Sequence, residues 1–368
     1  MAEPSKRYGK LDKPEEQSHI EVVEDPVTVF RAAHNLWSQE ANRSGFAFER
    51  REGYDSDLAK SLYDGAVKCL EKRSGAIKKI THDGIEKIVN EIPKDKLHSG
   101  LFVSALFNAS SLSEITGVFN YEILGYRLAK GKKLVAKSGS KILELGRESE
   151  GDIVNEGRVS SLAPYASANV VVNLGKAKWF GYCAKNGLYV NLGDTGSFGS
   201  KVEDGVYVNL CRVLSSAGKR KGFFGTGAVG GLLINAGDAH RMSYGGRPWT
   251  KPDSIQVNLG NVDCMAWYTN YGLHVNVGKI EHWCALASKA RGTAHVKLDK
   301  VSYRQGESKP HMGFENIIKR AKSLEWIRDL RNKPSQEAVE ALVRYDWNYF
   351  RSMMLTLKLF HNLWSAEK

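Results

Sequence analysis

The phrase Tyr-Val-Asn-Leu-Gly at residues 189–193 recurs, with small changes, through residues 153–278. Its asparagine falls at Asn155, Asn173, Asn191, Asn209, Asn235, Asn258 and Asn276. Successive asparagines lie 18, 18, 18, 26, 23 and 18 residues apart. Weaker copies at either end place Lys137 and Lys297 in the asparagine slot. A fixed period of about 20 residues is typical of a solenoid.

The residues beside the asparagine predict a β-strand. The preceding residue is Val or Ile in every copy and the following residue is mostly Leu. Side chains alternate along a strand, so these two columns share one face and the asparagines occupy the other. We therefore expect the Val and Leu columns to point into the core and the asparagines to point away. The glycine two residues after the asparagine suits a bend.

A second strand is predicted in each coil, because an aromatic residue recurs seven residues after the asparagine. It is Phe180, Phe198 or Trp283, and Phe224, Tyr244 and Trp267 are the equivalents expected in the longer coils. The stretch is rich in Gly and β-branched residues and lacks a helical period. The fold class predicted for residues 118–305 is therefore mainly β, a single-stranded parallel β-solenoid (β-helix) of about eight or nine coils. In repeat length and glycine use alone, it resembles glutamate-synthase-type β-helices.

The asparagine column has two interpretations. Stacked side-chain amides can bond from coil to coil, as they do in cross-β structures. Alternatively, the column could form a flat polar face that matches a repeating ligand. The ladder interpretation is favoured, because the asparagines follow the period of the fold itself.

Helical regions are expected on both sides of the solenoid. Residues 1–25 have the composition of a disordered tail, residues 26–117 form an N-terminal helical region and residues 306–368 a C-terminal one. Such helices would cover the ends of the solenoid and prevent edge pairing. The individual helices are expected to start at Pro26 and at Asp55 or Asp57, and to span 81–91, 94–117, 314–331 and 335–364.

The overall charge favours an acidic partner. The 368 residues carry a formal net charge of +12. Residues 132–309 hold 24 Lys and Arg against 14 Asp and Glu, so most of the excess belongs to the solenoid. A basic balance suggests nucleic acid or another polyanion, although it can also serve solubility alone.

The cysteines and the N-terminus favour a cytoplasmic protein. The five cysteines include no Cys-x-x-Cys pair and support neither a disulfide framework nor a zinc ribbon. The N-terminus lacks the apolar core of a signal peptide, and the longest apolar stretch, 101–119, is too polar to span a bilayer. We expect no membrane association, no metal and no cofactor.

Two motifs in the solenoid have plain structural interpretations. Residues 225–230, Gly-Thr-Gly-Ala-Val-Gly, match the dinucleotide fingerprint, but the solenoid phrase follows them where a helix would be needed. We expect solenoid corners there. His274 and His295 occupy equivalent positions in adjacent coils, with His282 nearby. A metal site is conceivable, but a surface stack of imidazoles is favoured.

The basic insertions are the candidate ligand site. The 26-residue coil adds a loop with Lys219, Arg220 and Lys221, and the 23-residue coil adds one with Arg247, Trp249 and Lys251. Insertions in a solenoid form side loops that often bind ligands. Lys and Arg can neutralise phosphates, and Trp can stack on a base. Two solvated loops without a ligand are the alternative.

These features together predict a non-catalytic binding or scaffold protein with a basic face, whose partner is a nucleic acid, another polyanion or a protein. The sequence contains no recognisable pair of catalytic nucleophile and base. It also lacks three common catalytic motifs, namely Gly-x-Ser-x-Gly, His-Glu-x-x-His and the P-loop signature. The alternatives are a β-helix enzyme subunit or carbohydrate-active enzyme, and a self-assembling structural protein.

Overall fold

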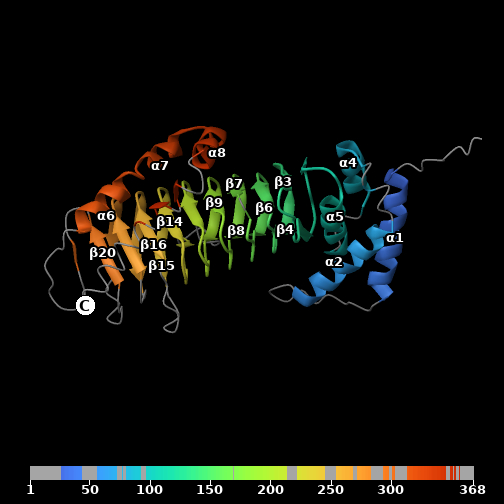
Figure 1. The fold of residues 1–368 in the computed structure, drawn as a ribbon, viewed down its shortest axis with the longest axis horizontal. Helices are drawn as coiled ribbons and strands as arrows, with labels where there is room; N and C mark the ends of the chain where they lie inside the picture. The colour runs from blue at the N-terminus through green and yellow to red at the C-terminus, as the bar shows by residue number, and fades with distance from the viewer. Residues whose placement is uncertain are drawn as a thin grey trace, which may run out of the picture.

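Stacked coils of parallel strands carry the N-terminal helices at one end, and the C-terminal helices lie along the side of the coils (Figure 1). The computed structural model describes residues 26–43, 56–72, 77, 80–92, 97–168, 170–213, 222–244, 254–267, 272–282, 293–297, 301–302, 313–344, 349–350, 352–353 and 356. The strands form a β-solenoid of about eight turns. The predicted fold class is therefore confirmed.

Each coil contributes one strand to each of two sheets, which we call sheet A and sheet B. Sheet A has 11 strands and sheet B has 10. Sheet A consists, in order, of β1 (Glu114–Gly117), β3 (Lys133–Ala136), β5 (Asp152–Asn155), β7 (Val170–Asn173), β9 (Leu188–Asn191), β11 (Val206–Asn209), β14 (Leu232–Asn235), β16 (Ile255–Asn258), β18 (Gly272–Asn276), β20 (Thr293–Lys297) and β21 (Val301–Ser302). Sheet B consists of β2 (Ile123–Leu124), β4 (Lys141–Leu145), β6 (Arg158–Leu162), β8 (Lys176–Phe180), β10 (Asp194–Phe198), β12 (Arg212–Val213), β13 (Phe223–Phe224), β15 (Asp238–Tyr244), β17 (Asn261–Trp267) and β19 (Lys279–His282). All pairings are parallel except that of β20 with β21.

The strand register follows the sequence repeat. Each asparagine of the column pairs with the asparagine of the next coil, from Asn155 opposite Asn173 to Asn258 opposite Asn276. In sheet B, Phe180 pairs with Phe198 and Phe198 with Phe224, as predicted. The expected equivalence of Tyr244 and Trp267 with these aromatics is wrong, because Met242 and Met265 continue the column. Trp283 lies outside the described residues.

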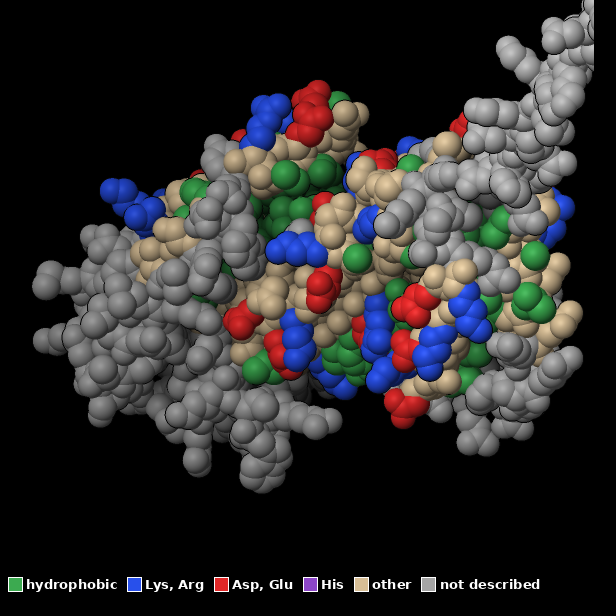
Figure 2. Space-filling view, turned by 45° about the vertical axis from the view of Figure 1, so that its right-hand side comes forward, with side chains coloured by type: hydrophobic (Ala, Val, Ile, Leu, Met, Phe, Trp, Pro, Cys, Tyr) green, Lys and Arg blue, Asp and Glu red, His purple; other side chains and the backbone are tan. Residues whose placement is uncertain are grey.

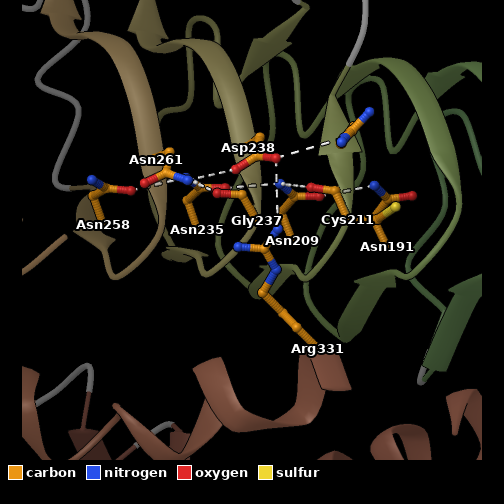
Figure 3. Close-up of polar contacts among 10 residues, drawn as sticks. Asn191, Asn209, Cys211, Asn235, Gly237, Asp238, Asn258, Asn261 and Arg331 are labelled. Carbon is orange, nitrogen blue, oxygen red and sulfur yellow. Dashed lines mark hydrogen bonds and ion pairs between the residues drawn. The ribbon is translucent and has the colours of Figure 1, made fainter. Parts of the chain in front are cut away.

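The asparagines point into the solenoid, so the predicted facing of sheet A is wrong. All seven are buried. Each Nδ2 atom donates to the Oδ1 atom of the next asparagine across 2.7–2.9 Å, from Asn155 through to Asn276. The ladder interpretation of the column is thus confirmed (Figure 3).

The residue two positions before each asparagine also points inward. Tyr189 and Tyr207 stack with their ring centroids 4.8 Å apart, and they lie in one buried cluster with Phe180 and Phe198 of sheet B. Aromatic stacking between coils therefore fills the space between the two sheets.

The Val and Leu columns point outward, where the chain's own C-terminal segment covers them. This C-terminal arm comprises α6 (Gly313–Lys322), α7 (Trp326–Asp329), the 3₁₀ turn η1 (Leu330–Asn332) and α8 (Ser335–Arg344). A second buried cluster joins the outward columns to the arm; it includes Val190, Val208, Ile234 and Val257 from sheet A and Ile317, Ala321, Leu324, Ile327 and Leu342 from the arm. Figure 2 shows apolar side chains beneath the C-terminal helices. Both faces of sheet A are buried over these coils, which is why strand alternation alone gave the wrong facing.

Polar contacts fix the arm at one edge of the coils. Asp238 at the start of β15 lies 3.6 Å from Arg331 of η1 and accepts a hydrogen bond from Asn261 at 2.9 Å (Figure 3). Arg328 donates from Nε to the backbone oxygen of Leu259 at 2.9 Å. The single helix predicted for 314–331 is interrupted by a turn at 323–325. That turn divides the arm into α6 and α7.

The N-terminal helices pack at the opposite end of the solenoid (Figure 1). They are α1 (Pro26–Arg43), α2 (Ser56–Glu71), α4 (His82–Glu91) and α5 (Leu97–Ala109). Thr81 caps α4, because its hydroxyl accepts a hydrogen bond from the amide of Gly84. Helix α5 is apolar on all sides and packs against β2. The helix predicted for 94–117 is confirmed only as α5, since β1 begins at Glu114.

The glycines after the asparagines allow the coils to stack closely. A Cβ atom on Gly193 would lie 2.1 Å from the backbone oxygen of Gly175. In the Gly-Thr-Gly-Ala-Val-Gly segment, Gly225 and Gly227 have φ angles of 74° and 64°, and strand β14 follows. The predicted solenoid corner is confirmed at this segment.

Candidate polyanion-binding face

The six residues predicted to bind a polyanion lie outside the described residues. Lys219, Arg220 and Lys221 fall in 214–221, and Arg247, Trp249 and Lys251 fall in 245–253. The first insertion interrupts sheet B between β12 and β13, whereas the second connects β15 to β16 of sheet A. The expected clustering of the two loops therefore stays a prediction.

Within the described solenoid, a different set of cations is stacked on sheet B. Lys141 pairs in register with Arg158, and Arg158 pairs with Lys176. Each residue is the first of its strand, and all three side chains are exposed. None of the three forms a salt bridge within the described residues, and the next residue of the column is Asp194. We call Lys141, Arg158 and Lys176 the cation column.

Like charges directly opposite one another on a sheet are destabilising. The three groups are held at strand spacings of about 4.8 Å, so their positions are fixed by the register and not by mutual attraction. Salt bridges do occur on the neighbouring sheet A, where Lys133 pairs with Glu114 and Lys137 with Glu156, each at 3.0 Å. The cation column thus stands out as a local concentration of unneutralised positive charge.

A groove runs along the edge of the coils beside the cation column. It has a volume of about 680 Å³ and is lined by residues of five consecutive coils, from residues 138–141 to Cys211. Its floor is the glycine edge, which includes Gly157, Gly175 and Gly193, and it is lined by all three residues of the cation column. Glu156 and Asp194 also line it, and Asp194 begins β10 of sheet B, so three cations face two carboxylates along the groove.

An exposed aromatic residue lies on the same sheet. Trp179 is the fourth residue of β8, and 43% of its surface is exposed. Its register neighbours are Ser161 on one side and Ser197 on the other. Both neighbours are small, so no residue adjacent to Trp179 in register covers the indole. Lys178, which precedes it, is also exposed.

Two aromatic rings lie between two cations at the corner that follows sheet B. The guanidinium of Arg147 lies 4.9 Å from the ring centroid of Tyr165, and that ring is 5.8 Å from the ring of Tyr182. The Nζ atom of Lys201 donates to the Tyr182 hydroxyl at 2.9 Å. Tyr165 is 44% exposed, so this corner presents a second exposed aromatic ring.

One ion pair at this corner is buried. Arg147 contacts the Glu144 carboxylate at 3.0 Å, and both side chains are about one-tenth exposed. Burial raises the pKa of Glu144, and the adjacent Arg147 opposes that rise. Arg147 is therefore partly neutralised, unlike the cation column. Figure 2 shows Lys and Arg side chains over the middle coils with Asp and Glu interspersed.

Other predicted features differ from expectation. His274 pairs in register with His295 but is fully buried, so the predicted surface stack is wrong. Cys264 is disulfide-bonded, which the cysteine spacing did not predict, while Cys69, Cys183 and Cys211 are free. A disulfide is more typical of an oxidising compartment, and the cytoplasmic location stays a prediction. Among the described residues there is no cluster of potential metal ligands, and no helix is long and apolar enough to cross a bilayer.

Comparisons with protein-family models, curated proteins and solved structures find no match for this chain.

Sequence reasoning missed the cation column, although the signal was present. Arg158 and Lys176 each lie three residues after an asparagine of the ladder. Aligning all copies of the repeat on the asparagine places these two cations in one column. The two insertions break the period of the repeat, whereas the cations recur with it.

Proposed function

We propose that this protein is a non-catalytic β-solenoid scaffold that binds a polyanion along sheet B. The observation that carries the proposal is the cation column: Lys141, Arg158 and Lys176 are exposed, in register on adjacent strands, and without a salt bridge in the described part of the chain. A polyanion would neutralise these like charges, which the fold holds opposite one another on adjacent strands.

The spacing of the column supports a linear ligand. Three residues on adjacent strands span about 10 Å along the solenoid axis. A nucleic acid strand carries one phosphate per about 3.4 Å of helix axis, so the column can contact two or three phosphates of a chain that runs along that axis. The groove beside it crosses five coils in the same direction. A further exposed cation, Lys178, lies two residues after Lys176 in the same strand and outside the cation column.

The test is a fluorescence-anisotropy titration with a labelled polyanion at three salt concentrations. The variant changes Lys141, Arg158 and Lys176 together to Gln, which removes charge and keeps most of each side-chain stem. Each phosphate neutralised contributes roughly −0.7 to the log–log salt slope for a single strand. We expect the triple variant to bind more weakly and to flatten that slope by about two units.

A matched control removes the same charge elsewhere. Lys60, Lys68 and Lys87 are exposed on α2 and α4, away from sheet B, and none forms a salt bridge within the described residues. Changing these three to Gln should leave the salt slope unchanged. Equal losses in both triple variants would mean that only net charge matters, and would contradict a localised site. Absence of binding by the wild-type protein at low salt would contradict the proposal altogether.

A further inference from the structure

The basic face carries a feature that phosphate neutralisation does not require, namely the exposed ring of Trp179. A buried position is available to aromatic residues in this fold, since Phe180, the next residue, is 1% exposed inside the solenoid. Trp179 instead points outward with 43% of its surface in solvent. Exposure of so large an apolar ring has a hydrophobic cost.

The surroundings of Trp179 leave room for a planar group. Strands are about 4.8 Å apart, so the next outward side chains of the same column are one strand spacing away on each side. They are Ser161 and Ser197, and no aromatic or cationic side chain stacks on the Trp179 ring within the described residues. Ser161 is half-buried and Ser197 is buried, so neither serine covers the exposed part of the indole, and a nucleobase can approach that part of the ring from solvent.

The position of Trp179 relative to the cation column matches the shape of a nucleotide. Trp179 lies three residues after Lys176 in β8, a distance of about 10 Å along the strand. A chain whose phosphates follow the column along the solenoid axis would direct its bases across sheet B toward Trp179. In a duplex the bases stack on one another and are not available to the indole, whereas a single strand presents them.

We infer that the ligand is a single-stranded nucleic acid, an inference that rests on the proposed polyanion-binding function. Its phosphates lie on Lys141, Arg158 and Lys176, and one base stacks on Trp179. The stack does not depend on which base is present, because every base has a π-face. The site thus binds single strands in preference to duplexes, without reading their sequence.

The test compares three probes on the full-length protein: an oligothymidylate of about 16 nucleotides, a duplex of the same length and inorganic polyphosphate. For the Trp179→Ala variant we expect affinity for the oligothymidylate to fall about 5- to 150-fold, as loss of one base–aromatic stack produces. Affinity for polyphosphate and duplex should stay unchanged. The salt slope should also stay unchanged, because no cation is lost.

Two further variants keep the result interpretable. Trp179→Phe retains a ring and should recover most of the lost affinity. Leu143→Ala is the matched control, because Leu143 is also on sheet B and is also 43% exposed, yet has no ring; it should bind all probes as the wild type does.

The possible failures are distinguishable. If the wild type binds none of the three probes at low salt, the polyanion-binding function itself fails. If it binds all three and Trp179→Ala has no effect, or weakens all three equally, polyanion binding stands and the single-strand inference is overturned. A Phe variant as weak as the Ala variant would likewise overturn the stacking role.

Discussion

The asparagine ladder makes a sharp prediction about stability, and Asn209 is the best place to test it. Its side chain is fully buried. Nδ2 donates to Asn235 Oδ1 at 2.8 Å and to the backbone oxygen of Cys211 at 3.0 Å, while Oδ1 accepts from Asn191 Nδ2 at 2.9 Å. Substitution by Ala removes all three bonds, each contributing about 1 kcal/mol net. Leaving Asn191 Nδ2 buried without its acceptor adds roughly 1–2 kcal/mol.

We therefore expect Asn209→Ala to lower the free energy of unfolding by about 4–5 kcal/mol. Urea denaturation followed by circular dichroism measures this change. Asn90→Ala is the control, because Asn90 is exposed on α4, and surface substitutions usually change stability by less than about 0.5 kcal/mol. If Asn209→Ala cost no more than Asn90→Ala, the ladder would contribute nothing to stability and the reasoning would be wrong.

An isosteric variant separates hydrogen bonding from packing. Asn209→Asp keeps the shape, but an ionised carboxylate cannot donate to Asn235 and would be buried without a cation. Burial raises the pKa of such a carboxyl above its unfolded value. The folded state then binds the proton more tightly than the unfolded state. The free energy of unfolding therefore falls as pH rises from the pKa of the unfolded state to the higher pKa of the folded state. We expect the variant to be more destabilised relative to wild type at pH 8 than at pH 5.

Two further predictions concern the interior and the buried ion pair. Tyr189 is fully buried against Tyr207 and donates to the Ala166 oxygen at 3.1 Å. Tyr189→Thr should therefore destabilise the protein by about 3 kcal/mol, as large-to-small core changes do. A change below about 1 kcal/mol in urea denaturation would contradict the inward position of Tyr189. Burial raises the pKa of Glu144, so the contribution of Glu144 to stability should decline as pH rises above the ordinary pKa of Glu. Glu144→Gln should remove that part of the pH dependence of the free energy of unfolding. Identical pH profiles of wild type and variant would refute the raised pKa of Glu144.

The sequence alone determined the period, and with it the register. The spacing of Asn155, Asn173 and Asn191 predicted which residues stack on which, and the strand pairing agrees. This was possible because a solenoid is stabilised by contacts between neighbouring coils, so its long-range pairing is encoded as a local repeat. The corners at Gly225 and Gly227 were predictable for the same reason.

Part of the cation column was also within reach of the sequence, because the register follows from the repeat. Arg158 and Lys176 become neighbours as soon as the coils are aligned, whereas Lys141 lies four residues after Lys137 and was placed in the column only by the strand register. Alternation predicts that Trp179 and Phe180 point to opposite sides of β8, but it does not predict that the adjacent residues Lys178 and Trp179 are both exposed.

The facing of sheet A was decided only by the tertiary structure. Val190 and Tyr189 are both apolar enough for a core, and period-2 alternation cannot rank two apolar faces. The choice was made by the C-terminal arm, more than 100 residues away, whose Ile317, Leu324 and Ile327 bury the outward Val column. Once that column is covered from outside, the asparagines can turn inward, where the amide of one asparagine donates to the next along the ladder.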